Sequence, residues 1–291
     1  MEQRNINHPD ANPPVIFNSV NDCYKGTVWV SNEGLHYVVL QYNSKFDIIV
    51  KCIEIGNIMS VKLYPLRTGS IKNNYLRGKY GGYFGDGKYT KHGNIKAYLS
   101  WTNMLRQTSI EGQRNNIRNI SYIGVSVYDQ WYNFQIFAEW FENYISQLNP
   151  EYYNDYQLDK DILTFNNHNI RMYSPDTCSI VPSAINFALA SQEKNRTEDL
   201  PTGVHKNSEN SYSINISTGN YRITDIGVYK NPEDAFLAYK KAKENYLHEL
   251  ADFYYNKGCI LKNVYDALYN INIVPYKNKL KECKPKNGSI N

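Results

Sequence analysis

Two acids and a polar loop stand close together in the middle of the chain, within residues 158–186. Asp159 and Asp161 are separated by one residue, and the loop that follows contains three asparagines and His168. Carboxylate, amide and imidazole groups together are ligands that a Mg²⁺-type ion accepts. Such an ion can bind a scissile phosphate and stabilise its leaving oxygen. The stretch therefore predicts a Mg²⁺ (or Mn²⁺) site for phosphodiester hydrolysis.

A β-strand is the element expected to position these groups. In a strand, Asp159 and Asp161 share one face, and the lysine between them points away. We expect Asp159 to hold the ion with help from Asn186, while Asp161 or His168 orients or deprotonates water. The alternative for His168 is a loop histidine that is simply exposed.

Arg171 follows the polar loop. Its guanidinium could bind a phosphate through two parallel hydrogen bonds. The alternative is an arginine on a solvated surface without a partner of this kind.

The run LDKDIL…YSPDTCSIVPSAIN, residues 158–186, resembles the short HNH-type nuclease core of phage-encoded endonucleases. The segments before it, WTNMLR (101–106), GVSV (124–127) and the aromatic run from Trp131, resemble the helical lead-in of the same proteins. The resemblance implies a metal-dependent DNA endonuclease in which Asp159 matches the metal-binding acid.

The same resemblance implies that Asn186 is the closing polar residue that helps to hold the ion. The chain departs from the family at Lys160, where HNH nucleases place a histidine as general base. A protonated lysine cannot take a proton from water unless burial lowers its pKa by several units. Either another group supplies the base, or the site has lost catalysis and kept its shape.

A second unit follows, with three strand-like runs at 202–208, 211–218 and 221–229 and then one helix. Asn231 is a good N-cap and Pro232 fits the first helical position. The predicted apolar face consists of Ala235, Tyr239, Ala242, Tyr246 and Leu250. The lysines expected outside are Lys240, Lys241 and Lys243.

This second unit resembles the DNA-binding domain of plant ethylene-response factors (APETALA-like), which also occurs in phage homing endonucleases. The matching residues are Gly203-Val204, YSINI (212–216), IGVY (226–229) and PEDAFLAYKKAK (232–243). In that family the sheet enters the major groove of DNA. The residues that would then face DNA are His205, Lys206, Tyr212, Asn215 and Arg222. Because the family's sheet is rich in arginine and this one has a single arginine, we expect specific binding through this unit alone to be weak.

Composition limits the class of protein. The chain has 291 residues, a net charge of +4 and a mean hydropathy of −0.60. No apolar run approaches the ~20 residues that span a bilayer, and the N-terminus is polar. We therefore expect no membrane partner and a cytoplasmic protein. The resemblance to phage-encoded proteins implies that this is the cytoplasm of a bacterial host cell. The five scattered cysteines form no CxxC pair, which predicts reduced, mostly buried thiols and neither a zinc knuckle nor a disulfide framework.

The predicted fold class is α+β. Four β-type runs between residues 25 and 66 predict a small N-terminal antiparallel β-barrel of SH3-like type. A helical plus ββα-metal (HNH-like) centre follows, and then a C-terminal three-stranded sheet with one packed helix. The predicted domains are a disordered arm (1–23), the SH3-like domain (24–77), a Gly-rich linker (78–93), the helical and HNH-like core (94–196), the sheet-and-helix DNA-binding domain (197–258), and a short helix with a basic tail (259–291).

Three functions remain open at this point. The first is an HNH-type DNA endonuclease of phage or mobile-element type that acts on double-stranded DNA with Mg²⁺ or Mn²⁺ and no small-molecule cofactor. The second is a non-catalytic DNA-binding protein, favoured by the lysine in the base position. The third is a factor whose N-terminal barrel binds a host protein. The sequence leaves the oligomeric state undetermined.

Overall fold

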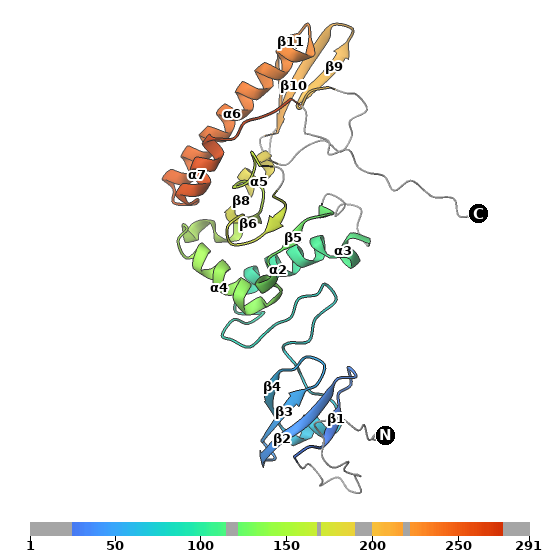
Figure 1. Ribbon diagram of the computed structural model, residues 1–291. Coiled ribbons are helices and arrows are strands. Elements are labelled where there is room, and N and C mark those ends of the chain that lie inside the picture. The colour runs from blue at the N-terminus through green and yellow to red at the C-terminus, as the bar shows by residue number, and fades with distance from the viewer. Residues whose placement is uncertain (1–24, 115–121, 168–169, 190–199, 218–221, 276–291) are drawn as a thin grey trace, which may run out of the picture. The chain divides into compact units, whose positions relative to one another are not determined.

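The computed structural model describes residues 25–114, 122–167, 170–189, 200–217 and 222–275 (Figure 1). The fold is of the α+β class. The chain divides into two compact units: unit 1 consists of residues 1–88 with 133–135, and unit 2 of residues 89–132 with 136–291. The arm 1–23, His168 and the basic tail beyond residue 275 lie outside the described residues.

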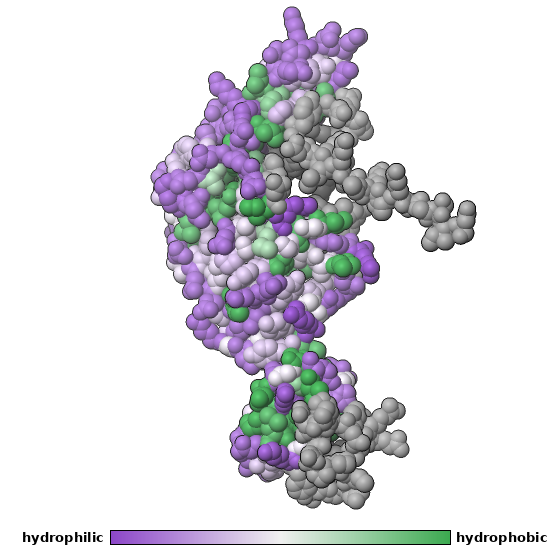
Figure 2. All heavy atoms as spheres, viewed as in Figure 1, coloured by the Kyte–Doolittle hydropathy of each residue, from purple (hydrophilic) through white to green (hydrophobic). Residues whose placement is uncertain are grey.

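Unit 1 is built on a four-stranded antiparallel sheet in the order β1-β2-β3-β4. Its strands are β1 (Val28–Val30), β2 (His36–Ser44), β3 (Asp47–Cys52) and β4 (Ile58–Val61), and the short helix α1 (Leu63–Thr68) follows. The alternation of buried and exposed side chains along β3 is that of a strand with one face on a core. On the face shown in Figure 2, hydrophobic residues gather over these strands, and the exposed apolar side chains of this sheet include Val30 and Ile58.

The sheet of unit 1 is open, so the predicted closed barrel is wrong. Among the described residues, β1 pairs with β2 alone and β4 with β3 alone. β1 has three residues and β4 has four, which leaves little length for the tilt and stagger that closure requires. The core is covered instead by the chain that follows the sheet, since Leu66 of α1 and Ile71 pack into it.

Unit 2 begins with α2 (Ile95–Thr108), which has the bounds that its apolar periodicity predicts. Trp101, Met104 and Leu105 of this helix are buried. The Trp101 indole N–H donates to the carbonyl of Trp131 at 2.7 Å. The elements that follow are α3 (Ile110–Arg114), β5 (Ser126–Val127), the 3₁₀ helix η2 (Asp129–Tyr132), α4 (Phe134–Ile145) and the 3₁₀ helix η3 (Pro150–Asp155).

Two small sheets lie in the middle of the chain. β5 pairs in parallel with β7 (Met172–Tyr173), and β6 (Tyr156–Asp159) pairs antiparallel with β8 (Ser179–Pro182). All four residues of β8 are buried, and α5 (Ser183–Leu189) follows directly. Of the two acids singled out by the sequence, Asp159 ends β6 and Asp161 lies in the segment between β6 and β7.

The C-terminal part confirms the predicted three strands and one helix. β9 (Val204–Ser208), β10 (Ser211–Ser217) and β11 (Arg222–Tyr229) form an antiparallel sheet with β10 in the centre, and α6 (Pro232–Asn256) packs against all three strands (Figure 1). The Asn231 side chain caps the helix by accepting from the N–H of Asp234 at 2.8 Å. Helix α7 (Lys262–Tyr269) then packs on α6.

The buried face of α6 differs from the predicted one. Lys243, expected outside, is 6 % exposed, because the buried positions of the helix advance through residues 239, 243, 247 and 251. Burial lowers the pKa of Lys243 to about 8. Its ammonium lies 5.8 Å from the ring centre of Tyr246.

The described cysteines Cys52, Cys178 and Cys259 are buried and unpaired as disulfides, as expected. Cys23 and Cys283 lie outside the described residues. Within the described residues, no helix has the length and apolar character needed to cross a membrane.

Candidate functional site

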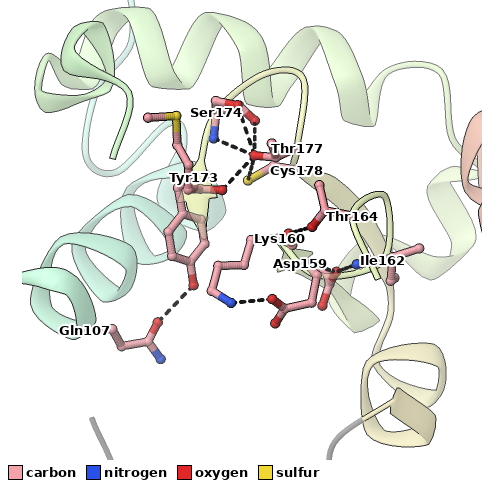
Figure 3. A network of polar contacts seen from close by, with 11 residues as sticks. Gln107, Asp159, Lys160, Ile162, Thr164, Tyr173, Ser174, Thr177 and Cys178 are labelled. Atoms are coloured by element: carbon pink, nitrogen blue, oxygen red, sulfur yellow. Dashed lines mark hydrogen bonds and ion pairs between the residues drawn. The ribbon is translucent and has the colours of Figure 1, made fainter. Parts of the chain in front are cut away.

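Asp159 ends β6 and closes the turn that follows it. Its Oδ1 accepts hydrogen bonds from the backbone N–H groups of Asp161 and Ile162, each at 2.8 Å (Figure 3). Asp159 also pairs across the strands with Ser179 of β8. A carboxylate that accepts two backbone N–H groups fixes the direction of the chain after a strand. The first role of Asp159 is therefore to shape this turn.

Asp159 is 7 % exposed. Burial, and then the negative charge of Asp161, raise the pKa of this carboxyl to about 6, although its backbone hydrogen bonds act in the opposite direction. Its second oxygen accepts no hydrogen bond from the described residues. Beside it, the buried Ser179 hydroxyl has no hydrogen-bond partner within the described part of the chain. This corner between β6 and β8 thus holds, in a buried place, a carboxylate oxygen with no described hydrogen bond and a hydroxyl with no described partner.

Lys160 lies against Asp161 and two tyrosines. Its Nζ is 2.5 Å from Asp161 Oδ1 and 5.5 Å from the ring centre of Tyr122. It also lies 5.9 Å from the ring centre of Tyr173, and Figure 3 shows Lys160 and Tyr173 together. The lysine side chain is 11 % exposed, whereas that of Asp161 is 65 % exposed. We expected Lys160 to point away from the acids, but β6 ends at Asp159 and the strand alternation ends with it. The turn brings the ammonium to the acid and over the faces of two tyrosine rings.

The YSPDTC sequence forms a second tight turn at this place. Thr177 Oγ1 accepts from the N–H of Ser174 at 3.1 Å and donates to the carbonyl of Met172 at 2.7 Å. Burial holds the pKa of the Cys178 thiol far above its ordinary value, so this thiol stays protonated and is a poor nucleophile. Burial likewise raises the pKa of Tyr173. Tyr173, Ser174, Thr177 and Cys178 of this motif are buried and support the site, whereas Pro175 and Asp176 are exposed.

The two described residues predicted alongside the acids, Asn186 and Arg171, do not converge on Asp159. Asn186, in α5, donates through its amide to Gln157 Oε1 at 2.9 Å. Arg171 is exposed, and its backbone carbonyl accepts from Ser126 as β5 pairs with β7. His168 lies outside the described residues. The partners of Lys160 that sequence reasoning missed are the two tyrosines, which no local motif marks because Tyr122 is distant in the sequence.

The described residues do not make a complete Mg²⁺ site. They contain no cluster of three His, Cys, Asp or Glu side chains able to hold a metal ion. Asp161 already holds the Lys160 ammonium, and Asn186 faces Gln157. A single carboxylate oxygen of Asp159 is too little for an ion that takes six oxygen ligands. The Lys160 ammonium occupies the position beside Asp161 that a metal ion would need.

The C-terminal sheet has one covered face and one open face. Val204 and Ile214 are paired across β9 and β10 and are buried on the side of α6. Side chains alternate along a strand, so the next cross-strand row, His205, Ser213 and Val228, lies on the other side. We call this side the open face.

Two amides complete the open face. The Ser213 hydroxyl donates to Asn207 Oδ1 at 2.9 Å, which places Asn207 beside that row. Asn215 lies two residues from Ser213 on β10 and therefore shares its face. Val228 is 73 % exposed. The open face thus presents neutral hydrogen-bonding groups and one apolar side chain.

Two of the other three residues implied by the resemblance lie on the helix side of the sheet. Lys206 and Tyr212 pair with each other and belong to the row that shares its side with Val204 and Ile214. Arg222 pairs with Ser217 at the end of the sheet, and its side chain lies outside the described part of the protein. His205 and Asn215 are therefore the two predicted DNA-facing residues that the structure brings together.

Comparisons with family models, curated proteins and solved structures gave no significant match. The chemistry must then be read from the two sites themselves. The centre is a buried acid, a lysine held by an acid and two rings, and tight turns. The open face is an accessible array of donors and acceptors.

Proposed function

We propose that the protein binds duplex DNA through the open face of its β9–β11 sheet, without cleaving it. The observation that carries the proposal is the row His205–Ser213–Val228, flanked by Asn207 and Asn215. Asparagine can make two hydrogen bonds to adenine, serine bonds to either base pair, and an apolar side chain contacts the thymine methyl. A helix covers the opposite face, which leaves the open face as the one able to enter a groove.

Among the described side chains of the open face only His205 can carry a positive charge, so we expect recognition by these residues to depend on base contacts. The test uses the full chain and a duplex selected by it from a random-sequence pool, with binding followed by fluorescence anisotropy. His205→Ala/Asn215→Ala is expected to weaken binding by at least ~10-fold. Tyr212→Phe, on the helix side of the same strand, is the matched control and is expected to bind as the wild type does. Failure of the wild type to select any duplex would refute the proposal.

Metal-dependent cleavage of DNA by an HNH-like centre is the second candidate. The available oxygen of buried Asp159 and the adjacent Ser179 hydroxyl favour it. The test is nicking of plasmid DNA with Mg²⁺ or Mn²⁺. Asp159→Asn is the variant of choice, because an amide oxygen can still accept the two backbone hydrogen bonds of the turn. Nicking by the wild type that this variant abolishes would establish cleavage, and no nicking in either metal would exclude it.

A further inference from the structure

The glycine-rich segment Lys72–Lys88 of unit 1 has a defined shape, although it forms neither helix nor regular strand. Gly78 N–H donates to the carbonyl of Gly82 at 2.7 Å, and Gly81 N–H donates to that of Gly78 at 2.9 Å. Gly85 N–H reaches back to the carbonyl of Asn74 at 2.7 Å. Gly81 and Gly85 have φ values of 86° and 69°, which side-chain-bearing residues rarely adopt. The segment is a folded loop.

One side of this loop is anchored within unit 1 by residues 133–135. Tyr83 forms a β-bridge with Asn133, and the Tyr83 carbonyl accepts from the N–H of Phe134 at 2.9 Å. The rings of Phe84 and Phe134 are 4.9 Å apart. A Cβ added at Gly85 would lie 2.3 Å from Asn133 Oδ1, so this glycine allows close packing. The glycines are therefore explained by the fold and need no phosphate ligand.

The exposed side chains of the loop are mostly cationic. Lys72, Arg77, Lys79 and Lys88 are all exposed. Arg77 lies over the ring of Tyr83 at 5.4 Å and donates to the Gly81 carbonyl at 2.6 Å, while Lys79 lies over the ring of Tyr80 at 5.8 Å. Cations held against rings lose less side-chain entropy when they bind an anion.

The single acid of the segment, Asp86, hydrogen-bonds to residues of the same loop. Asp86 accepts from the Asn74 amide at 2.9 Å and is hydrogen-bonded to the Tyr75 hydroxyl. Four cations against this one acid give the segment a net charge of +3 over residues 72–88, of the chain's total of +4. The ring of Tyr83, which lies beneath Arg77, stacks on the ring of Tyr75 with centres 5.7 Å apart.

We propose that the Lys72–Lys88 loop is a second contact of this protein with DNA, one that binds the phosphate backbone and is independent of base sequence. The proposal rests on the DNA binding proposed above. The loop would add positive charge to the described side chains of the open face, of which only His205 can be cationic. A chain of backbone phosphates fits several fixed cations on a polar loop. An acidic protein surface is the alternative partner, which the experiment below distinguishes.

The experiment measures the affinity of the full chain for the selected duplex as a function of salt between about 50 and 200 mM. Each lysine that neutralises a phosphate contributes about −0.9 to the slope of log affinity against log salt. Lys79→Ala/Lys88→Ala is therefore expected to make this slope shallower by about 2. Lys45→Ala/Lys62→Ala removes two other exposed lysines of unit 1 and is expected to leave the slope unchanged.

The inference would be overturned if Lys79→Ala/Lys88→Ala kept the wild-type slope, or if both double variants made the slope shallower by the same amount. The open-face proposal would stand in either case. A wild type that binds no duplex even at low salt would overturn both. In a parallel arm, a polyglutamate probe replaces DNA. If Lys79→Ala/Lys88→Ala loses binding to polyglutamate and retains the wild-type DNA slope, the loop binds an acidic protein and the phosphate contact is refuted.

Discussion

Asp159 Oδ1 accepts a hydrogen bond from the backbone N–H of Asp161 at 2.8 Å, so the two acids that the sequence offers as a metal pair are joined in one turn. The side chain of Asp161 in turn holds Lys160. This arrangement gives both acids a structural role and satisfies the charge of Asp161 with an ammonium.

Two substitutions of Asp159 separate the hydrogen bonds that its carboxylate accepts from the negative charge that it carries. Asp159→Ala leaves two N–H groups of the turn without an acceptor, one of them buried, which is expected to lower the free energy of unfolding by about 1–3 kcal/mol. Asp159→Asn keeps an acceptor oxygen and is expected to be at least as stable as the wild type at pH 8. Denaturant unfolding of the three proteins measures this. Equal destabilisation by both substitutions would show that the turn depends on the charge.

The pKa of Asp159 gives the pH dependence of stability. A folded-state pKa of about 6, above the ordinary value of 3.8, means that the folded protein binds this proton more tightly than the unfolded chain does. Stability linked to this group therefore increases as pH falls from about 6 toward 4, by on the order of 3 kcal/mol. The difference in unfolding free energy between the wild type and Asp159→Asn should be largest at pH 8 and shrink below pH 6. A difference that is constant from pH 4 to 8 would contradict the raised pKa.

Gly203 controls the packing of the C-terminal sheet on α6. Its φ is 76°, and a Cβ there would lie 2.1 Å from the Tyr239 ring. Backbone strain at this φ and overlap with the Tyr239 ring each cost about 1–3 kcal/mol. Because the two costs add, Gly203→Ala is expected to lower the free energy of unfolding of this part of the chain by more than either cost alone. Gly34 has a similar φ of 81°, but a Cβ added there would meet no atom within 4 Å. Gly34→Ala therefore serves as the control, with a loss of about 1 kcal/mol of stability expected from the backbone conformation alone. Thermal unfolding of both variants measures the difference. Equal effects would show that Tyr239 moves aside freely.

Asp252 holds α7 against α6. Its two oxygens accept from the hydroxyls of Tyr265 and Tyr269 at 3.0 Å and 2.7 Å. Asp252→Ala is expected to speed hydrogen exchange of the α7 amides several-fold, because both phenols lose their acceptor. Asp266→Ala breaks an exposed pair with Lys262 on the same helix and is expected to change exchange little. Equal acceleration in both variants would mean that charge on α7, and not the phenol contacts, sets its docking.

Local sequence signals predicted the elements that depend on local physics. The apolar spacing of Trp101, Met104 and Leu105 defined α2, and the Asn231 cap with Pro232 defined the start of α6. Turn residues between the β-type runs marked the strands of both larger sheets. In each of these cases the determining contacts lie within one or two turns of the chain.

The features that sequence reasoning missed depend on contacts between residues that are far apart in the chain. Lys243 is buried because what packs on α6 changes along its length, and its apolar stem can lie in a core. Lys160 meets Tyr122 across a gap in sequence that no periodicity spans. His205 and Asn215 lie on the open face, and Lys206 and Tyr212 lie on the opposite side of the sheet. The pairing register decides this, and strand propensity does not determine the register.

The central claim is that the open face of the C-terminal sheet contacts duplex DNA. The most direct measurement is a titration of the full chain with the selected duplex, followed residue by residue through backbone amide chemical shifts. Changes are predicted at His205, Ser213, Asn215 and Val228, with the exposed outer side of α6 unaffected. An absence of changes on the open face at low salt, or changes confined to α6 and α7, would contradict the account.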